Sequence, residues 1–340
     1  MLRKLTALAL FLALALSGCA LPGASQKQYQ ATYLDLFDTV TVISGLSDSE
    51  EAFQAEAQRI HDRLLFYHQL FDIYHDYEGL HNLKTVNDSA GGAPVAVDES
   101  VIRFLTDCKA YYELTGGAVN IAMGSVLSLW HAARTAGIHD PQSAALPDSQ
   151  ALEQASLHTG WEAIVIDRDA STVCLSDPLL RLDVGAVAKG WAAQQVAQTA
   201  PQGFLISVGG NVCATGPKDA AGTPWVVGIT DPDGGDYLHT LNITDLSVVT
   251  SGDYQRCYEV DGRIYHHIID PETLFPAQYW RSVTIVCQDS GLADALSTAL
   301  FVLPLEKGQA LLTACGAEAM WADAQGGLYY SPGFQALIRR

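Results

Sequence analysis

The chain has 340 residues and a formal net charge of −19 at pH 7, with 38 acidic residues against 19 basic ones. A charge of this sign argues against sequence-independent binding to nucleic acid, which needs a cationic surface. It does not exclude a small phosphate-bearing ligand, because a bound metal cation can supply positive charge locally.

The first 18 residues are typical of a bacterial lipoprotein signal peptide. Arg3 and Lys4 precede residues 5–16, which are almost wholly apolar but too few to span a membrane. The sequence Leu-Ser-Gly-Cys that follows resembles a lipobox, so we expect Cys19 to be lipidated; the alternative is an ordinary signal peptide with a chance cysteine. Residues 19–30 would then form a lipid-anchored tether at the extracytoplasmic face of the bacterial cell membrane.

Residues 31–340 are expected to form one domain. Without Arg3 and Lys4, 17 basic residues remain against 38 acidic ones, a net charge of −21. The six cysteines after Cys19 form no CxxC pair, so the sequence indicates neither a zinc site nor thioredoxin-like chemistry, and we predict no disulfide.

Alternating β-branched residues over 39–44 predict the first strand of this domain. Apolar residues then recur at helical spacing and predict a helix from Ser47 to about residue 74, with a capping box that starts at Ser47. A second helix is predicted to begin after Asp98 and to end at the glycine pair 116–117.

Residues 140–150 are rich in turn-forming residues and predict a surface loop. Strands dominate from residue 163 onward, and two helices follow from about residues 291 and 305. This mixture of helices and antiparallel hairpins predicts an α+β fold rather than a doubly wound sheet. The predicted strands lie within 163–169, 171–175, 204–210, 225–231, 238–245 and 257–269.

Residues 263–276 contain two adjacent histidines at the end of a predicted hairpin. The turn signal at 261–262, Asp-Gly, would place Arg256 opposite His267. Neighbouring residues of a strand point to opposite faces, so His266 and His267 cannot both face one site. The hairpin register therefore predicts that His267 shares a face with Arg256 and that His266 lies on the other face.

The stretch 181–198 combines two glycines with small residues at a predicted helix start. Free N–H groups at a helix N-terminus suit a phosphate, small side chains let a ligand approach the backbone, and Lys189 adds a cation. The pattern is neither a Walker A loop nor a dinucleotide fingerprint, and a tightly packed buried helix is the alternative. A second glycine-rich segment, 205–216, marks either an approach of the backbone to a ligand or a bulge.

The predicted helix over 293–303 carries Asp294 and Thr298 four residues apart, and therefore on one face, among apolar neighbours. Unpaired buried polar groups are costly, so this pair needs partners. Coordination of Mg²⁺, which takes few protein oxygens together with substrate phosphates, would provide them. The alternative is that Asp294 caps the helix and Thr298 bonds back to a carbonyl.

Four segments resemble, in order and spacing, the motifs of the ApbE family of FAD:protein FMN transferases, formerly called thiamine biosynthesis lipoproteins. The resemblance covers about residues 33–325, and the lipobox agrees with it. It implies a single ApbE-like, T-fold-like domain of mixed, largely antiparallel sheets flanked by helices. The segments are DVGAVAKGWA, SVGGNVCATG, TSGDYQRCYEVDGRIYHHIIDPET and ADALSTALFVL.

The resemblance implies a magnesium-dependent enzyme that cleaves FAD, attaches its FMN half through a phosphoester to a Thr or Ser of a partner flavoprotein, and releases AMP. The sequence leaves open two alternatives: an FAD pyrophosphatase that uses water as the acceptor, and a non-catalytic flavin-binding surface lipoprotein. The chain contains no Asp-Gly-x-(Ser/Thr)-x-(Ala/Ser)-Thr-like segment of the kind that relatives modify. We therefore expect the acceptor to be another protein.

The resemblance also implies roles for particular residues. The metal ligands would be the backbone carbonyl of Ala186 and the side chains of Asp294 and Thr298, whereas Ser297 stands where some relatives have a metal-contacting aspartate. His267 aligns with a recurring histidine of the family. It would act as the general base toward the acceptor hydroxyl, with a pKa near its ordinary value; the alternative is a structural histidine that orders the site.

The implied flavin contacts are less closely matched to the family pattern. Two positions where relatives have glycine are occupied by Asp38 and Leu274. A glycine at 274 would suit a turn with positive φ or clearance for the ligand, so we expect the loop after Asp270 to follow a different path near the acceptor. The implied flavin-contacting residues are Phe37, Ala118, Val119, Asn120, Asp183, Lys189 and Ile269.

Overall fold

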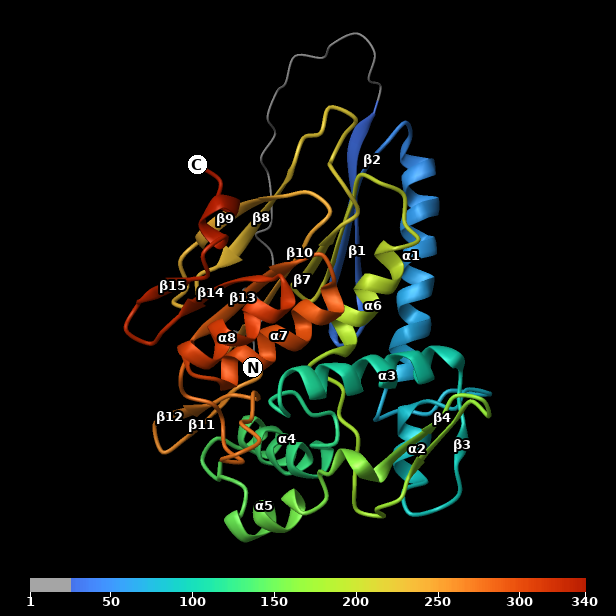
Figure 1. Cartoon of the computed structure of the whole chain (residues 1–340), viewed down its shortest axis with the longest axis vertical. Helices are drawn as coiled ribbons and strands as arrows, with labels where there is room; N and C mark the ends of the chain where they lie inside the picture. Colours follow the sequence, from blue (N-terminus) through green and yellow to red (C-terminus); the bar gives the residue numbers. More distant parts are fainter. Residues whose placement is uncertain (1–25) are drawn as a thin grey trace.

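The computed structural model describes residues 26–340, and the predicted signal peptide and Cys19 lie outside the described residues. The central element is an eight-stranded sheet in which all neighbouring strands are antiparallel (Figure 1). In spatial order its strands are β1 (Lys27–Leu36), β2 (Thr39–Ser47), β6 (Phe204–Val208), β7 (Asn211–Ala214), β10 (Ser247–Gly252), β13 (Ser282–Cys287), β14 (Glu318–Ala322) and β15 (Leu328–Tyr330).

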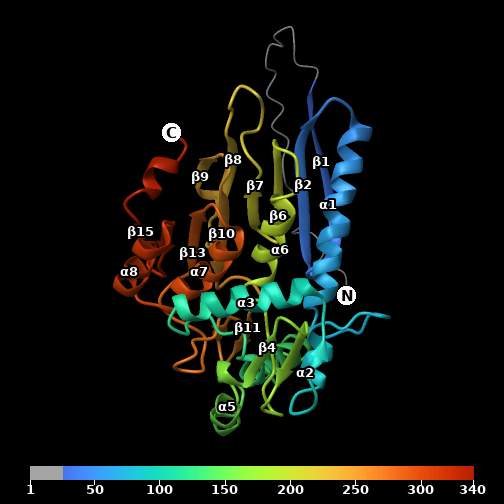
Figure 2. The same cartoon turned by 45° about the vertical axis from the view of Figure 1, so that its right-hand side comes forward.

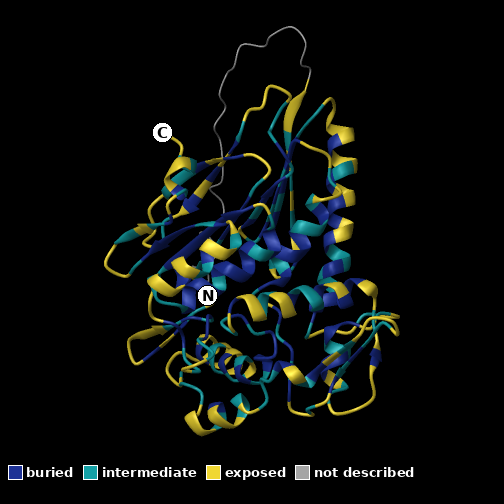
Figure 3. Cartoon of the chain, in the orientation of Figure 1, coloured by how far each residue is buried: buried dark blue, intermediate teal, exposed yellow. Residues whose placement is uncertain are grey.

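Helices cover one face of this sheet (Figure 1). Their apolar side chains and those of the facing strand positions form the largest hydrophobic core, which includes Phe53, Trp191 and Leu296. One helix of this layer, α7, is buried along almost its whole length (Figure 3), because its sequence is apolar on nearly all sides. The helices are α1 (Glu50–Phe71), α6 (Ala188–Ala197), α7 (Ser290–Val302) and α8 (Leu305–Cys315).

The hairpin of β8 (Trp225–Thr230) and β9 (Tyr237–Ile243), with the short helix η2 (Phe334–Leu337), covers the opposite face. Strand β13 is buried at every position because its alternate side chains enter two cores. Ile285 packs in the helical core, and its neighbour Val286 packs under the β8–β9 hairpin.

A second group of elements lies beyond one end of the main sheet, where α3 crosses beneath the helical layer (Figure 2). The side chains of Phe104 on α3 and Trp191 on α6 belong to one core, so both groups form a single α+β domain, as predicted. Within residues 26–340, no helix combines the length and apolar character needed to cross a membrane. The group contains α2 (Leu83–Asp88), β3 (Val95–Ala96), α3 (Glu99–Leu114), α4 (Gly124–His139), α5 (Ser149–Ser156), η1 (Trp161–Ala163), β4 (Ile164–Asp167), β5 (Thr172–Leu175), β11 (Tyr258–Val260) and β12 (Arg263–Tyr265).

The N-terminal boundaries differ from those expected. Strand β1 begins at Lys27, so residues 27–30 of the predicted tether belong to the sheet. The predicted helix cap at Ser47 is wrong, because Ser47 pairs with Lys27 at the end of β2. The cap is Ser49, whose hydroxyl accepts the N–H of Ala52 at 3.1 Å.

Elements with complete local signals were correctly predicted. Helix α3 starts after Asp98, whose carboxylate accepts an N–H of its first turn, and α7 and α8 begin near the expected residues. The Asp-Gly turn pairs Val260 with Arg263, the register that such a turn implies. The sequence does not predict α4, whose N-cap Met123 makes no side-chain hydrogen bond that would mark a helix start.

Helices α6 and α7 meet at Gly190, and we expect Gly190→Ala to disrupt this contact. A Cβ at position 190 would overlap the carbonyl oxygen of Ser290 and the Cβ of Asp294. The free energy of unfolding should fall by about 3 kcal/mol, as measured by urea unfolding. Gly308→Ala in α8 is the matched control, because its Cβ would lie 3.3 Å from Leu300 Cγ and should change stability by less than about 1 kcal/mol. Equal effects of the two substitutions would contradict the role of Gly190 in packing.

Candidate active site

A cavity of about 770 Å³ lies where the main sheet and its helices meet the second group of elements. This volume is in the range of roughly 300–1,000 Å³ that is usual for sites of small molecules and cofactors. Every residue that the sequence singled out as catalytic, flavin-contacting or metal-ligating lines this one cavity. These residues are Phe37, Ala118, Val119, Asn120, Asp183, Ala186, Lys189, His267, Ile269, Asp294 and Thr298.

Asp294 lies inside α7, and its carboxylate is buried. Oδ2 accepts the N–H of Gly190 at 2.8 Å, and Nζ of Lys189 lies 3.8 Å from it. Burial raises the pKa of Asp294, and Lys189 and the Gly190 N–H oppose this rise only in part. The alternative role of Asp294 as a helix cap is wrong, because Asp289 caps α7.

Thr298 follows Asp294 by one helical turn and lines the same cavity, as their spacing predicted. Ser297 points elsewhere: its hydroxyl donates to the carbonyl oxygen of Asp294 at 2.9 Å and is hydrogen-bonded to the Ser251 hydroxyl at 2.8 Å. Ala186 lies in the segment that leads into α6 and also faces the cavity. Asp294, Thr298 and Ala186 thus line one cavity, to which they can offer a carboxylate, a hydroxyl and a backbone carbonyl oxygen.

This oxygen set fits a small hard cation. Residues 26–340 contain no cluster of three or more His, Cys, Asp or Glu side chains arranged around a metal position. The set at Asp294 is of another kind, with one carboxylate, one hydroxyl and one backbone carbonyl. Mg²⁺ commonly keeps several waters or substrate phosphates beside few protein ligands. A cation would also stabilise the charged form of the buried Asp294 carboxylate, whose burial otherwise disfavours that form.

His266 is a structural residue of the loop after the hairpin. Strand β12 ends at Tyr265, before both histidines, so the predicted strand does not reach them. Nδ1 of His266 accepts the N–H of Ile268 at 3.2 Å, which leaves the ring proton on Nε2 to be donated to the Ala277 carbonyl oxygen at 2.8 Å. With both ring nitrogens engaged and the side chain buried, His266 orders the loop.

His267 faces the cavity, as predicted, although the expected ladder pairing with Arg256 is wrong because β11 begins only at Tyr258. Its Nδ1 is buried and has no hydrogen-bond partner among residues 26–340. Burial, and to smaller extents Arg256, His266, Arg134 and Lys189, lower the pKa of His267 to about 3. The expectation of an ordinary pKa is therefore wrong, and His267 is neutral at pH 7.

We expect His267 to lower the stability of the protein in acid. The pKa of this group is near 6.5 in the unfolded chain and about 3 in the folded protein, so the unfolded state binds more protons between these values. Its contribution to the free energy of unfolding therefore falls as the pH decreases below 6.5, by about 2 kcal/mol at pH 5. Urea unfolding at pH 7 and pH 5 should show that His267→Gln loses about 2 kcal/mol less than the wild type. Equal losses would contradict the lowered pKa.

Phe37 and Asp38 form the two-residue turn between β1 and β2, next to the cavity. Both have a φ of +52°, as in a type I′ turn, and Asp is one of the residues that tolerate this left-handed conformation. The Phe37 N–H donates to Nδ1 of His68 at 3.1 Å, and the Phe37 ring packs edge-on against the imidazole. Asp38 thus adopts the conformation for which the family glycine is suited.

The segment 183–190 borders the cavity, but its glycines serve packing and local hydrogen bonds. Gly185 is exposed and lines the cavity, and its N–H donates to Oδ1 of Asp183 at 3.0 Å. Gly190 is a packing residue, and its N–H is taken by Asp294. The N–H groups of Gly185 and Gly190 therefore bond carboxylates of the cavity and are not free for a phosphate.

Gly209 and Gly210 form the turn between β6 and β7, with φ of +60° and +94°, so the alternative of a bulge is wrong. A Cβ at Gly209 would lie 2.6 Å from the Thr39 hydroxyl oxygen, which shows how closely the two turns approach. Gly209 and Asn211 line the cavity. Asn211 lies beside Asp294 and lowers its pKa, although Nδ2 of Asn211 has no hydrogen-bond partner at normal geometry in the described chain.

The 118–120 segment forms a wall of the cavity after α3. Nδ2 of Asn120 donates to the Thr159 carbonyl oxygen at 2.9 Å, and its Oδ1 accepts the N–H of Ala122 at 2.9 Å. The side chain of Asn120 therefore holds the shape of this wall. Ala118 and Val119 offer small apolar surface beside it, which suits the approach of a planar ring.

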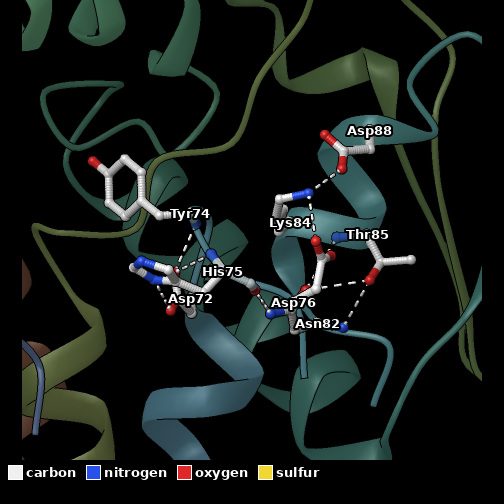
Figure 4. A network of polar contacts seen from close by, with 8 residues as sticks. All are labelled: Asp72, Tyr74, His75, Asp76, Asn82, Lys84, Thr85 and Asp88. Atoms are coloured by element: carbon white, nitrogen blue, oxygen red, sulfur yellow. Dashed lines mark hydrogen bonds and ion pairs between the residues drawn. The ribbon is translucent and has the colours of Figure 1, made fainter. Parts of the chain in front are cut away.

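The loop after α1 was not recognised as part of the site, and a polar network holds its shape (Figure 4). The Asp72 carboxylate accepts the N–H groups of Tyr74 at 2.6 Å and His75 at 3.2 Å, and it bonds the His75 ring at 2.9 Å. Lys84 joins Asp76 at 3.1 Å to Asp88 at 2.6 Å, which ties this loop to α2. The network holds Tyr74 by its backbone, while its ring points away from the network (Figure 4).

The Tyr74 ring lies at the cavity beside His131 of α4, with ring centroids 5.6 Å apart. Arg134, one turn further along α4, lines the cavity as well, and its Nη2 lies 3.2 Å from Nδ1 of His131. A local signal existed for Tyr74, because Asp72, Tyr74, His75 and Tyr77 cluster directly after a long helix. No such signal marked the residues of α4, because the helix itself was not predicted.

Comparison with known proteins identifies the family. A sequence model of the ApbE family matches residues 30–321. The FAD:protein FMN transferase of Treponema pallidum is 39% identical over 249 residues, which cover 68% of this chain and 67% of that protein. The chain belongs to the ApbE family. A second FAD:protein FMN transferase, from Vibrio cholerae, is 29% identical over 310 residues that cover 88% of each chain.

Solved ApbE structures share the fold. The crystal structure of the ApbE protein from Thermotoga maritima superposes with a TM-score of 0.82 at 29% identity, covering 92% of this chain and 100% of that chain. The flavin transferase ApbE from Vibrio cholerae superposes with a TM-score of 0.76 at 24% identity, covering 92% and 99%. The cavity described above therefore lies in an ApbE fold.

Leu274, like Asp38, is a position at which the family resemblance implied a glycine. Its φ is +62°, the left-handed conformation for which glycine is suited. Its N–H donates to the Asp270 carbonyl oxygen at 2.8 Å, and its own carbonyl accepts Nε1–H of Trp130 at 2.9 Å. The leucine is thus held in a left-handed conformation at a cost in backbone strain of about 1–2 kcal/mol.

A pair of substitutions at Leu274 should measure this strain. Leu274→Ala removes most of the side chain but keeps a Cβ in the left-handed conformation, whereas Leu274→Gly removes both. We expect the glycine variant to be more stable than the alanine variant by about 1 kcal/mol, as measured by urea unfolding. Because the lost packing is common to both variants, an alanine variant as stable as the glycine variant would show that the turn is unstrained.

Proposed function

We propose that this protein is a magnesium-dependent FAD:protein FMN transferase, which attaches the FMN half of FAD to a Thr or Ser hydroxyl of a partner flavoprotein and releases AMP. One observation carries the proposal: a single cavity joins His267, the oxygen set of Asp294, Thr298 and Ala186, and the residues implied to contact the flavin. Its ApbE-family relatives named FAD:protein FMN transferase support the same activity.

His267 is suited to take the proton from the acceptor hydroxyl, because it is neutral at pH 7 and faces the cavity. The hydroxyl oxygen then attacks the phosphorus of the FMN half. The bond from this phosphorus to the bridging oxygen breaks, and AMP leaves with that oxygen. Arg256, Arg134 and Lys189 each lower the pKa of His267. The negative charge of phosphates that enter the cavity would offset these positive charges, so the pKa of His267 would rise and the histidine would become a stronger base.

Asp294, Thr298 and the Ala186 carbonyl would hold the Mg²⁺ ion. When bound, the ion would neutralise phosphate oxygens and stabilise the charge that develops on the leaving AMP. Lys189 supports this arrangement from the protein side: its Nζ donates to the Gly185 carbonyl oxygen at 3.3 Å and lies 3.8 Å from Asp294. Lys189 thereby links the segment before α6 to the carboxylate on α7.

The test is to incubate the protein with FAD and Mg²⁺, with and without an acceptor that carries an Asp-Gly-x-(Ser/Thr)-x-(Ala/Ser)-Thr segment. Covalent, fluorescent flavin on the acceptor, together with AMP, supports the transferase. FMN and AMP formed at the same rate without acceptor would indicate the pyrophosphatase instead. Unchanged FAD under both conditions would leave only a flavin-binding protein and would refute the proposed reaction.

We also propose that Cys19 is lipidated and anchors the protein at the extracytoplasmic face of the bacterial cell membrane. The basic, apolar and Leu-Ser-Gly-Cys segments of the first 19 residues support this proposal, as does the tether that would follow them. Labelling with an alkyne fatty acid should tag the wild type but not Cys19→Ser. An unlabelled wild-type protein in the aqueous fraction would refute the anchor.

A further inference from the structure

Two arginines from distant parts of the chain meet at the cavity. Arg134 lies on α4, and Arg256 lies just before β11. Nη1 of Arg134 donates a long hydrogen bond of 3.5 Å to the carbonyl oxygen of Arg256. Both side chains line the cavity. Two guanidinium groups are therefore presented to the same space.

This pair of cations lacks a carboxylate partner. Neither Arg134 nor Arg256 takes part in an ion pair within residues 26–340. Asp183 is the carboxylate that raises the pKa of Arg134, but only as a minor effect, and its Oδ1 is engaged by the Gly185 N–H. Burial and the neighbouring Arg256 both lower the pKa of Arg134, which shows that the two positive charges oppose one another. An anion between them would remove this repulsion.

The backbone at Arg256 is strained where it borders the cavity. Arg256 has a φ of +46°, a left-handed conformation that is costly for a residue with a side chain. Nη1 of Arg134 contacts the carbonyl oxygen of this residue at 3.5 Å, and Nη2 of Arg134 is also in contact with His131 at 3.2 Å. Strain that persists beside a cavity commonly serves the geometry of a site.

The pair also lies close to the proposed base. Arg256 and Arg134 both contribute to the lowered pKa of His267, with the larger effect from Arg256. Lys189, the other cation of the cavity, is already 3.8 Å from Asp294. The arginines are thus the cations that remain free for substrate next to His267 among the residues that line the cavity.

We propose that Arg134 and Arg256 together bind phosphate oxygens of the FAD diphosphate. This inference rests on the proposed function. Guanidinium groups bind phosphate through two parallel hydrogen bonds each, a geometry that lysine cannot reproduce. When the bond between the FMN phosphorus and the bridging oxygen breaks, negative charge grows on the phosphates and AMP carries that oxygen away. The two arginines offset this charge while His267 holds the proton of the acceptor hydroxyl.

The experiment compares ligands with and without phosphate on the wild type, Arg134→Gln, Arg256→Gln and Arg256→Lys. Titration calorimetry with Mg²⁺ present measures the affinity of FMN against riboflavin and of AMP against adenosine. We expect each glutamine variant to bind at least one of the two phosphate ligands about 10- to 100-fold more weakly, with changes below about threefold for riboflavin and adenosine. Arg256→Lys should recover only part of the loss.

The arms of the experiment identify which phosphate is bound. Selective loss of FMN affinity assigns the pair to the transferred phosphate, selective loss of AMP affinity assigns it to the leaving phosphate, and loss of both assigns it to the whole diphosphate. Unchanged affinities, or equal losses with riboflavin and adenosine, would overturn the inference.

Arg263→Gln is the matched control, because Arg263 is exposed on β12 and stacks on Tyr265 at 5.2 Å outside the cavity. It should bind all four ligands as the wild type does, and thermal unfolding verifies that every variant is folded. The release of AMP from FAD by the wild type is followed in parallel. If the wild type releases no AMP, the proposed function fails, while the FMN and AMP affinities still decide whether the arginines bind phosphate.

Discussion

Replacing His267 by alanine should reduce the rate of FMN transfer by about 10²- to 10⁴-fold, the usual contribution of a general base. The affinity for FAD should change little, because the proposed role of His267 concerns the proton of the acceptor hydroxyl. Covalent flavin on the acceptor measures the transfer, and quenching of flavin fluorescence measures binding. A loss of FAD binding equal to the loss of transfer would instead indicate a structural role in ordering the site.

His266→Ala is the matched control. This substitution removes the hydrogen bonds to Ala277 and Ile268, so we expect the free energy of unfolding to fall by about 1–3 kcal/mol. The transfer rate should nevertheless stay within a few-fold of the wild type at a temperature well below the midpoint of unfolding. A loss of transfer as large as that of His267→Ala would refute the division of roles between the two histidines.

Asp294→Asn should abolish the dependence of activity on Mg²⁺ together with most of the activity. Asp294 is the single carboxylate of the proposed metal set, and an amide oxygen is a weaker ligand for a hard cation. In the wild type, Mg²⁺ at 100 times its dissociation constant should add about 2.7 kcal/mol to the free energy of unfolding. The variant should show no such gain. Thermal unfolding in EDTA and in millimolar Mg²⁺ provides the measurement.

The same substitution should not destabilise the metal-free protein, and we expect it to raise stability. Because burial raises the pKa of Asp294, the folded state binds the proton more tightly than the unfolded state, and stability falls as the pH rises from 3.8 through the raised pKa. At pH above that value the wild type carries the full cost of the buried charge, which asparagine avoids. Asparagine also keeps an oxygen to accept the Gly190 N–H.

Ser297→Ala is the matched control for Asp294→Asn on the same helix. Ser297 lies between Asp294 and Thr298 in the sequence and is buried. Its hydroxyl is hydrogen-bonded to that of Ser251, and Ser297 does not line the cavity. This variant should keep the Mg²⁺-dependent stabilisation of the wild type. A metal response lost in Ser297→Ala but retained in Asp294→Asn would refute the proposed ligands.

Much of the fold could be predicted because its signals are local. Helix α3 lies between the cap Asp98 and a glycine pair, and the β11–β12 register follows from its Asp-Gly turn. Prediction failed where the signal depends on other segments. Strand β13 is buried on both faces and shows no alternation, and the predicted cap at Ser47 failed because pairing with β1 places Ser47 in a strand.

The candidate site divides in the same way. Asp294 and Thr298 could be paired from sequence, since four residues along a helix place two side chains on one face. Arg134 could not be assigned to it, because α4 carries no cap signal, and the local signal at Tyr74 was not recognised. Leu274 was recognised as a departure from the family, but only the turn itself revealed that leucine adopts the glycine conformation.

The sequence by itself determined the ApbE family, the α+β class and eleven of the residues that line the cavity. Only the tertiary structure decided which groups are engaged and which are free. His266 is engaged by Ala277, 11 residues away, and Arg134 meets Arg256 across 122 residues. The lowered pKa of His267 likewise depends on burial and on charges from three separate segments. Hydrogen-bond partners, burial and electrostatic neighbours are properties of the folded chain, because they depend on segments that no local pattern brings together.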